Sequence, residues 1–377
     1  MTLELGTLMR TITTPPPVAP LRLHGGRPIL EPLPEHAWES RVVLNPAACL
    51  LPYDISLETL CDAWDLTLTE RTRLRDAGGV CVMLYRAQGA IIAEKRHAPS
   101  YLGLALFTPA LEIVRRYPAP VLTPEAPFHN LGVEDPRCTR VDDAFYLYYT
   151  GYATDYPGDP DAPRHVRICL ATTRDFLDWT LHGPVGGDVN TVDNKNAALL
   201  PRPVGDRWLL LHRPMEGPGA MAVHLAEAER PEGPWRSRGL LMQGFRYREF
   251  ARSWIGAGGP PLHLDGDRFL MIYHQGHFTP EGCREYDLAA ALLDLSAREP
   301  VCARIEPLMR PTEDAERRGD AELGVDNVLF TCANYRWNDR LVIPYAGADS
   351  RIFGASVSVE ALVTALEQTD VCARLGT

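Results

Sequence analysis

A turn–strand–tip motif that recurs five times constrains the fold more than any other feature of this sequence. Each copy has a Gly, Asp or Asn turn, a short apolar strand and a polar or aromatic tip. The copies begin at Gly79, Asp143, Gly205, Gly266 and Asn338. A second strand follows each copy, so each repeat unit is a small antiparallel sheet with a period of roughly 60 to 70 residues.

A small antiparallel sheet cannot bury both faces alone, and repeats of this period are typical of propellers, whose blades pack around an axis. A two-sheet sandwich would not explain five similar copies. The sequence therefore predicts an all-β fold, a five-bladed β-propeller over residues 39–377, with a Pro-rich N-terminal arm over 1–38. Apolar residues at helical spacing between Leu57 and Asp76 predict a short helical insertion in the first blade.

Composition excludes several classes of function. The chain has 377 residues and a net charge of −11, with no run of Lys or Arg, which argues against binding to nucleic acid or to an anionic membrane. No stretch has the pattern of a membrane span or signal peptide, and the nine cysteines include no C-x-x-C pair. We therefore expect a cytoplasmic protein with free thiols. The dispersed histidines predict no metal site, and no organic cofactor is expected.

The stretch from Phe128 to Thr154 carries the most reactive groups. It contains the loop Gly132–Arg137, in which Glu134 and Asp135 stand beside an arginine, followed by an aromatic strand and a Thr-Gly-Tyr end. A charged loop at the end of a rigid strand is a common place for a site. Taken alone, the stretch is equally well interpreted as a turn with a solvated ion pair.

In a propeller the polar tips of the blades meet at one mouth. The side chains expected there are Asn45, Arg86, Glu134, Asp135, Arg137, Asp193, Asn194, Lys195, His212, Arg213, His274 and Asp349. Individually, Arg86 and Arg213 are also compatible with structural ion pairs, and His274 with a core histidine. Together, several cations and carboxylates in an acidic protein suit a phosphate group beside a sugar.

Ten motifs, in order along most of the chain, resemble glycoside hydrolase family 130, the β-mannoside phosphorylases and β-mannosidases. The first two are G-V-E-D-P-R and Y-L-Y-Y-T-G-Y. The others include R-I-C-L-A-T-T-R-D-F-L-D-W, N-K-N-A-A-L-L-P, L-L-H-R-P, I-G-A-G-G-P-P, M-I-Y-H, A-A-A-L-L-D-L, D-N-V-L-F and Y-A-G-A-D. The resemblance implies a five-bladed propeller that acts on a β-mannoside oligosaccharide, with inorganic phosphate as co-substrate.

The resemblance also implies roles for individual residues. Asp135 would be the proton donor, acting through a mannose hydroxyl, in an inverting phosphorolysis that gives α-mannose 1-phosphate. The phosphate site would comprise Lys195, Arg213 and His274, with His212 nearby. The positions expected to line the sugar pocket are Asn45, Arg86, Glu134, Asp193 and Asp349. Hydrolytic members lose the basic set, so His212 and Arg213 favour phosphorolysis over hydrolysis.

One departure from the family pattern leaves an alternative open. Trp254 stands where the family often has a basic residue that meets phosphate. Arg252, two positions earlier on the same strand face, is a candidate substitute; otherwise Trp254 stacks on sugar and phosphate binding is weakened. The alternative is a β-mannosidase whose catalytic base is drawn from Glu216, Glu249 and Glu285. A third hypothesis is a non-catalytic sugar-binding propeller.

The sequence leaves linkage, acceptor sugar and oligomeric state open. The loops 155–164 and 244–252 are expected to decide the acceptor. The N-terminal arm and the helical insertion are candidate contacts in a homo-oligomer.

Overall fold

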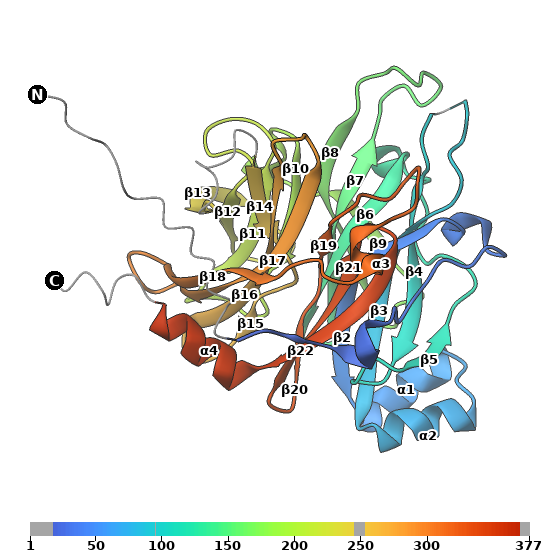
Figure 1. Cartoon of the computed structure of the whole chain (residues 1–377), viewed down its shortest axis with the longest axis horizontal. Helices are drawn as coiled ribbons and strands as arrows, with labels where there is room; N and C mark the ends of the chain where they lie inside the picture. The colour runs from blue at the N-terminus through green and yellow to red at the C-terminus, as the bar shows by residue number, and fades with distance from the viewer. Residues whose placement is uncertain (1–17, 95, 245–252, 370–377) are drawn as a thin grey trace, which may run out of the picture.

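The computed structural model describes residues 18–94, 96–244 and 253–369 and is built mostly of antiparallel strands (Figure 1). The strands of the first two groups are β2 (Val42–Pro52), β3 (Gly79–Gln88), β4 (Ser100–Phe107) and β5 (Ile113–Arg116), then β6 (Gly132–Val141), β7 (Ala144–Ala153), β8 (His165–Thr173) and β9 (Thr180–Pro184). One parallel bridge between Ser100 and Gly132 joins these two groups into one eight-stranded sheet.

Three further sheets follow along the chain. The third group is β10 (Asn194–Leu199), β11 (Trp208–Pro214), β12 (Val223–Ala228) and β13 (Arg236–Met242). The fourth is β14 (Ser253–Ala257), β16 (Arg268–Phe278), β17 (Arg284–Asp294) and β18 (Val301–Met309), with β15 (Leu262–His263) paired to β16. The last is β19 (Leu329–Phe330), β21 (Arg340–Gly347), β22 (Arg351–Ser358) and β1 (Leu21–Arg22), with β20 (Tyr335–Trp337) paired to β21.

The prediction of a mostly β protein is confirmed. The copies of the recurring motif fall on β3, β7, β11, β16 and β21, the second strand of each group. Within the described ranges no sheet closes on itself, and the number of blades stays a prediction. The described part of the chain also has no helix long and apolar enough to cross a bilayer.

The apolar core lies between neighbouring sheets. Alternate residues of β16 point in opposite directions, so Ile272 packs in one cluster with Tyr345 of β21, while Met271 packs in another with Leu211 of β11. Each sheet therefore buries both faces, as the repeat in the sequence requires. This packing of the apolar strand residues fixes the positions of the polar residues at the strand ends.

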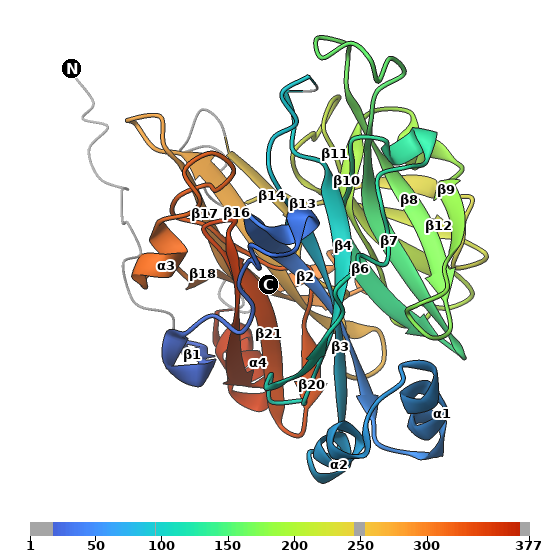
Figure 2. The same ribbon diagram turned by 90° about the vertical axis from the view of Figure 1, so that its right-hand side faces the viewer.

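The predicted helical insertion is present, but it consists of two helices, α1 (Ile55–Ala63) and α2 (Leu68–Asp76), at the lower end of β2 and β3 (Figures 1 and 2). The side chain of Asp54 accepts hydrogen bonds from the backbone of Ser56 and Leu57 and starts α1. Thr67 and Glu70 form a capping box that starts α2. Each cap satisfies backbone N–H groups at the start of its own helix, which explains why the insertion is divided into two helices.

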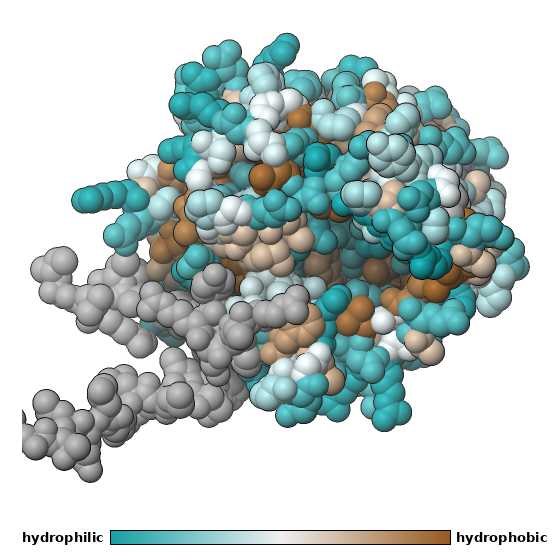
Figure 3. Space-filling view, turned by 90° about the horizontal axis from the view of Figure 1, so that it is seen from above, coloured by the Kyte–Doolittle hydropathy of each residue, from teal (hydrophilic) through white to brown (hydrophobic). Residues whose placement is uncertain are grey.

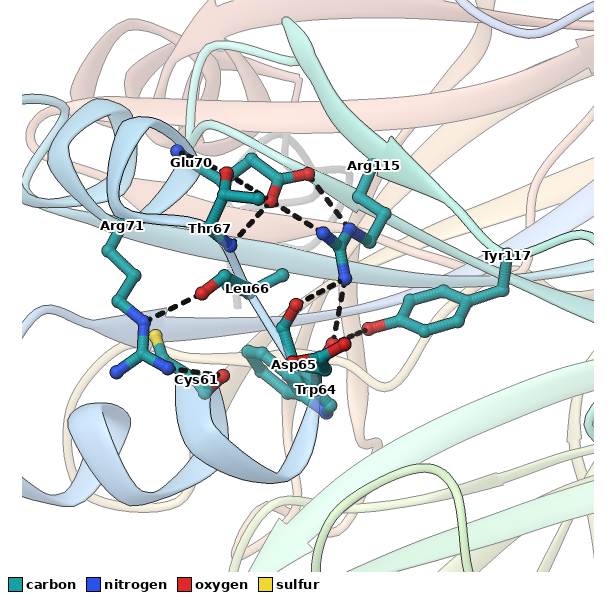
Figure 4. A network of polar contacts seen from close by, with 9 residues as sticks. All are labelled: Cys61, Trp64, Asp65, Leu66, Thr67, Glu70, Arg71, Arg115 and Tyr117. Carbon is teal, nitrogen blue, oxygen red and sulfur yellow. Dashed lines mark hydrogen bonds and ion pairs between the residues drawn. The ribbon is translucent and has the colours of Figure 1, made fainter.

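Polar contacts fix the insertion to the first sheet (Figure 4). Arg115, in β5, donates to Glu70 at 2.8 Å and 2.6 Å and to the carbonyl oxygens of Trp64 and Asp65. Arg71 donates to the carbonyl oxygens of Cys61 and Leu66. One arginine thus holds the start of α2 and the connection between the helices on the outer strand of the sheet.

The described part of the predicted N-terminal arm contributes a strand to the last sheet, because Leu21 and Arg22 pair with Ser356 and Ala355 of β22. Arg22 also donates to the fully buried carboxylate of Glu316, at 2.7 Å and 2.8 Å. Glu316 lies in the short helix α3 (Asp314–Arg317), and α4 (Val359–Gln368) packs its apolar face against the last two sheets. Short 3-10 turns cover Leu23–Gly26, Ala37–Glu39, Pro127–His129 and Asp188–Asn190.

The sheets share one polar end, at the top of Figure 1. There the first strand of each group begins, the second ends and the third begins. Figure 3 looks down on this end, whose surface is mostly hydrophilic. The charged residues that the sequence singled out lie at this end, away from α1 and α2.

Candidate active site

In three of the five groups, the first strand has a β-bulge close to its start. β2, β6 and β10 each have a β-bulge, and the bulges contain Asn45, Asp135 and Asn196, with φ of 49°, 50° and 57°. Asn and Asp tolerate this left-handed conformation better than other side-chain-bearing residues. Because a bulge turns a side chain away from the regular alternation, these three residues are re-aimed at the polar end.

Asp135 lies at the centre of a buried polar cluster. Its Oδ1 accepts a hydrogen bond from Asn45 Nδ2 at 2.6 Å and one from Arg86 Nη1 at 3.2 Å. Burial raises the pKa of this carboxyl, but the charges of Arg86, Lys195 and Arg137 outweigh burial and hold the pKa below its ordinary value. Asp135 is therefore ionised at neutral pH when no ligand is bound.

Arg86 ties Asp135 to its neighbours. Its Nη2 donates to Glu134 Oε1 at 2.7 Å, and its Nε donates to Ser100 Oγ at 3.0 Å. The Ser100 hydroxyl in turn donates to Glu134 Oε1 at 3.1 Å. Arg86 and Ser100 thus fix the orientation of the carboxylates of Glu134 and Asp135.

Arg137 has a structural role. Its guanidinium donates to the carbonyl oxygens of Gly258 at 2.7 Å, Ala257 at 2.9 Å and Asp135 at 2.9 Å, and it is 1% exposed. These bonds join the bulge of β6 to the end of β14. Arg137 contributes charge to the site, but its donors are committed to the backbone.

A pair of cations stands beside Asp135. Lys195 and Arg213 are direct cross-strand partners on β10 and β11, so their side chains share one face. Burial lowers the pKa of Arg213 to about 10, and burial and the charge of Arg213 lower that of Lys195. Arg213 Nε is buried and has no hydrogen-bond partner among the described residues. A buried arginine with an unsatisfied donor, beside a half-buried lysine, is suited to binding an anion.

His274 is a neutral member of this cluster. Its Nε2 lies 3.1 Å from Asn196 Nδ2 and 3.3 Å from Arg213 Nη1, both of which are donors, so Nε2 accepts and the proton sits on Nδ1. Burial and the nearby cations hold the pKa of His274 well below its ordinary value. His274 therefore orients Arg213 and adds no charge of its own.

His212 and Asp193 make their contacts elsewhere. The side chain of His212 lies on the face of β11 opposite to that of Arg213. There its Nδ1 lies 2.9 Å from Asn194 Nδ2, and its ring packs on His224. Burial lowers the pKa of His212 to about 3, so it is neutral. Asp193 accepts from Arg167 and from the backbone of Val166. The structure does not bring these two side chains into contact with the Lys195–Arg213 pair.

Trp254 lies close to the cation pair. It shares a strand face with His274, and its indole packs edge-on against Phe278 and Tyr286, with ring centroids 5.4 Å and 5.3 Å apart. Trp254 is only 7% exposed, so it forms part of a buried wall and offers no open stacking surface. Arg252, its candidate substitute, lies outside the described residues.

Among the candidate hydrolytic bases, Glu285 lies 3.6 Å from His277, on the strand face opposite Tyr286. Glu216 is exposed, and Glu249 lies outside the described residues. Neither Glu216 nor Glu285 has a described contact with Asp135.

The sequence did not single out Ser100, Asn196 or Tyr286. The charges of Arg213 and Asp349 both reach the hydroxyl of Tyr286, whose pKa is raised by burial. Asn196 had a usable signal, since K-N-A repeats the position of Asn45-Pro and Asp135-Pro in the other first strands. Ser100 and Tyr286 begin third strands, and only strand register brings them to the site.

Asp349 faces the cluster from the last sheet with φ of 47°. Burial raises its pKa from 3.8 to about 6; Arg86 opposes this shift and Asp135 adds to it. A raised folded-state pKa means that the folded protein holds the proton more tightly than the unfolded chain, so stability is lost as pH rises from about 4 to about 6.

We therefore expect Asp349→Asn to stabilise the protein by about 2–3 kcal/mol at pH 7 and to have little effect below pH 4. Asn tolerates the left-handed backbone at this position, so the change tests charge alone. Urea unfolding of both proteins across this pH range measures the difference. A stability difference that does not change with pH would contradict the assignment.

Comparison with known proteins places the chain in a family. Residues 75–368 match the model of glycoside hydrolase family 130, described as β-1,4-mannooligosaccharide phosphorylase. The chain belongs to this family, and it is an enzyme of the mannoside phosphorylase type. A 1,2-β-oligomannan phosphorylase from Thermoanaerobacter sp. (strain X514) is 29% identical over 328 residues, covering 86% of this chain and 93% of the relative.

Solved structures show the same fold. The β-1,2-mannobiose phosphorylase of Listeria innocua, solved with β-1,2-mannobiose, aligns with a TM-score of 0.68 at 19% identity, covering 92% of this chain and 99% of that one. Another structure comes from work on glycoside hydrolases of this family that target β-1,2 mannosidic linkages in Candida mannan. It aligns with a TM-score of 0.68 at 20% identity, covering 91% of this chain and 94% of that one.

Proposed function

We propose that this protein is an inverting phosphorylase that cleaves a β-1,2-linked mannoside with inorganic phosphate to give α-mannose 1-phosphate. The observation that carries the proposal is the pair of Lys195 and the buried Arg213 beside Asp135, with the unsatisfied Nε of Arg213. Hydrolysis needs a base for water and has no use for this pair of cations, whereas phosphate is already an anionic nucleophile. The linkage rests on the β-1,2 enzymes among the relatives.

In the proposed reaction, a phosphate oxygen held by Lys195 and Arg213 attacks C1 of the terminal mannose from the face opposite the leaving oxygen. The glycosidic C1–O bond breaks, and Asp135 supplies the proton to the leaving oxygen through a mannose hydroxyl. The free carboxyl is ionised because cations surround it. Phosphate offsets the charge of Lys195, which raises the pKa of Asp135 and favours the protonated form when both substrates are bound.

The remaining assignments follow the same scaffold. Asn45, Arg86, Glu134 and Asp349 would hold the hydroxyls of the mannose, and Asn196 and His274 would keep Arg213 in place. We further propose that the five groups of strands are the blades of a propeller around this site. Five successive groups with the same strand order, and a propeller-like fold among the family's structures, support this arrangement.

Product analysis tests the proposal. With β-1,2-mannobiose and phosphate, we expect equimolar α-mannose 1-phosphate and mannose, little turnover without phosphate, and much slower turnover of β-1,4-mannobiose. Arg213→Ala should raise the KM for phosphate by about tenfold or more, because a desolvated cation–anion contact is lost. The exposed Arg236→Ala is the matched control, since it lies on an outer strand. Mannose release at the same rate without phosphate would refute phosphorolysis.

Trp254 is the observation that favours a second function, hydrolysis. A basic residue at this position would add a third cation, and its absence weakens the anion site. The family also contains hydrolases that act on β-1,2 mannosidic linkages. The same product analysis decides between the two, since only hydrolysis gives two molecules of mannose.

A further inference from the structure

The geometry of an inverting displacement divides the site into two sides. Nucleophile and leaving group must stand on opposite sides of the anomeric carbon. If the proposed function holds, phosphate occupies the Lys195–Arg213 side of Asp135. Lys195 and Arg213 belong to β10 and β11, whereas Arg86, at the end of β3, and Glu134, at the start of β6, belong to the eight-stranded sheet. The leaving sugar is therefore expected to face this part of the eight-stranded sheet.

Tyr152 stands beside Glu134 on that side. In the β6–β7 register, Tyr152 is directly opposite Gly132 and Thr150 is opposite Glu134, so Tyr152 and Glu134 share a face. A Cβ at Gly132 would come within 3.2 Å of Glu134 Oε1 and 3.0 Å of Ser100 Cβ. Glycine at position 132 thus lets Glu134 Oε1 and Ser100 lie close to the backbone directly opposite Tyr152.

The ring of Tyr152 is held from two loops. Arg164 Nη1 donates to its hydroxyl at 3.1 Å, and the guanidinium carbon lies 5.9 Å from the ring centroid. The imidazole of His97 packs edge-on at 5.3 Å, and its Nε2 lies 2.8 Å from the carbonyl oxygen of Leu131, to which it donates. Tyr152 is half-buried, so the residue is partly accessible to solvent near the polar end.

The two loops are joined above this position. Arg96, in the β3–β4 connection, forms an ion pair with Asp161, in the β7–β8 connection. Both connections rise above the sheets at the polar end (Figures 1 and 2). The charges of Glu134 and Arg86 reach the imidazole of His97, which places this aromatic group within range of the reacting cluster. The loops therefore form one wall.

We propose that Tyr152, braced by His97 and Arg164, is the binding wall for the leaving sugar, a neutral hexopyranose that is the acceptor when the reaction runs in reverse. A fixed aromatic ring offers its flat face to the C–H side of a pyranose at low entropy cost, and the charged edge beside it offers partners for hydroxyls. Tyr152 would thereby help to determine which acceptor is used, without touching phosphate.

Synthesis from α-mannose 1-phosphate and mannose tests this role, because the two substrates occupy opposite sides of the site. Tyr152→Ala should raise the KM for mannose by about tenfold or more and change the KM for α-mannose 1-phosphate by less than about twofold. Tyr152→Phe keeps the ring and should raise the KM for mannose by less than about threefold. Tyr146→Ala is the matched control, because Tyr146 is a half-buried tyrosine near the opposite end of the same strand, where its hydroxyl donates to Glu232, and its loss should change neither KM value.

Equal changes in both KM values, or a lower kcat with both KM values unchanged, would overturn the proposal. So would a Tyr152→Phe variant as impaired as Tyr152→Ala, since the ring itself would then not matter. If Tyr152→Ala does not fold, Tyr152→Leu removes the flat ring at similar volume and is judged by the same two KM values. A wild-type enzyme that releases mannose without phosphate refutes the proposed function instead; Tyr152 is then tested by the KM for mannobiose, with the same variants.

Discussion

Asp135→Asn is expected to lower kcat for phosphorolysis of β-1,2-mannobiose by about 10²- to 10⁴-fold while leaving substrate binding nearly unchanged. The amide oxygen of the variant can still accept from Asn45 and Arg86, so the geometry of the cluster is preserved. The proton that the leaving oxygen requires is no longer available. Rates of α-mannose 1-phosphate formation and a binding titration with mannobiose measure the two effects separately.

Asp193→Asn is the matched control for this substitution. Asp193 is also an acidic residue near the start of a first strand, but it is paired with Arg167 and has no described contact with Asp135. Its replacement should leave kcat within about threefold of the wild type, as expected for a residue that makes no transition-state contact. Full activity in Asp135→Asn would contradict the assignment of the proton donor. Unchanged function in every assay would favour the non-catalytic binding protein.

Arg137→Met is expected to give the largest loss of stability, about 3 kcal/mol or more. Methionine fills part of the same volume but cannot donate to the carbonyl oxygens of Asp135, Ala257 and Gly258. These oxygens would remain buried with fewer partners, and the bulge of β6 would lose its connection to β14. Urea unfolding at pH 7 measures the change in the free energy of unfolding.

The exposed Arg140, on the same strand, provides the control for Arg137. Among the described residues its Nε donates to the nearby carbonyl oxygen of Asp142 and its guanidinium lies over the Phe145 ring, so Arg140→Met, which keeps an apolar side chain there, should change stability by less than about 0.5 kcal/mol. Comparable losses in both variants would mean that the bonds of Arg137 to the backbone are not what stabilises the fold. Activity should fall in Arg137→Met, because Asp135 belongs to the same bulge.

Strand positions were predictable because the pattern that marks them is local. Each copy of the repeat carries its own turn and apolar run, and these became β3, β7, β11, β16 and β21. The helical insertion was predicted from its periodicity, but its division into two helices depends on capping by Asp54 and by Thr67 with Glu70. Those caps were visible in the sequence and could have been used.

Site residues were predictable where they lie at the end of a strand. They were less predictable where the face of the strand determines which way the side chain points. One contiguous set of contacts and charges joins seven of the expected residues: Asn45, Arg86, Glu134, Asp135, Lys195, Arg213 and His274. His212, adjacent to Arg213 in sequence, points the opposite way because successive strand residues alternate. Ser100 and Tyr286 depend on pairing between distant segments, which no single-sequence pattern specifies.

The pairing of β1 with β22 has a consequence for how the chain is made. Leu21 and Arg22 leave the ribosome long before their partners Ser356 and Ala355, because most of the described fold lies between them in the chain. The edge of β22 can therefore pair with this strand only after all the other sheets have been synthesised. Closure of the last sheet is thus a late folding step, and a nascent chain that ends before β22 has no strand edge at which β1 can dock.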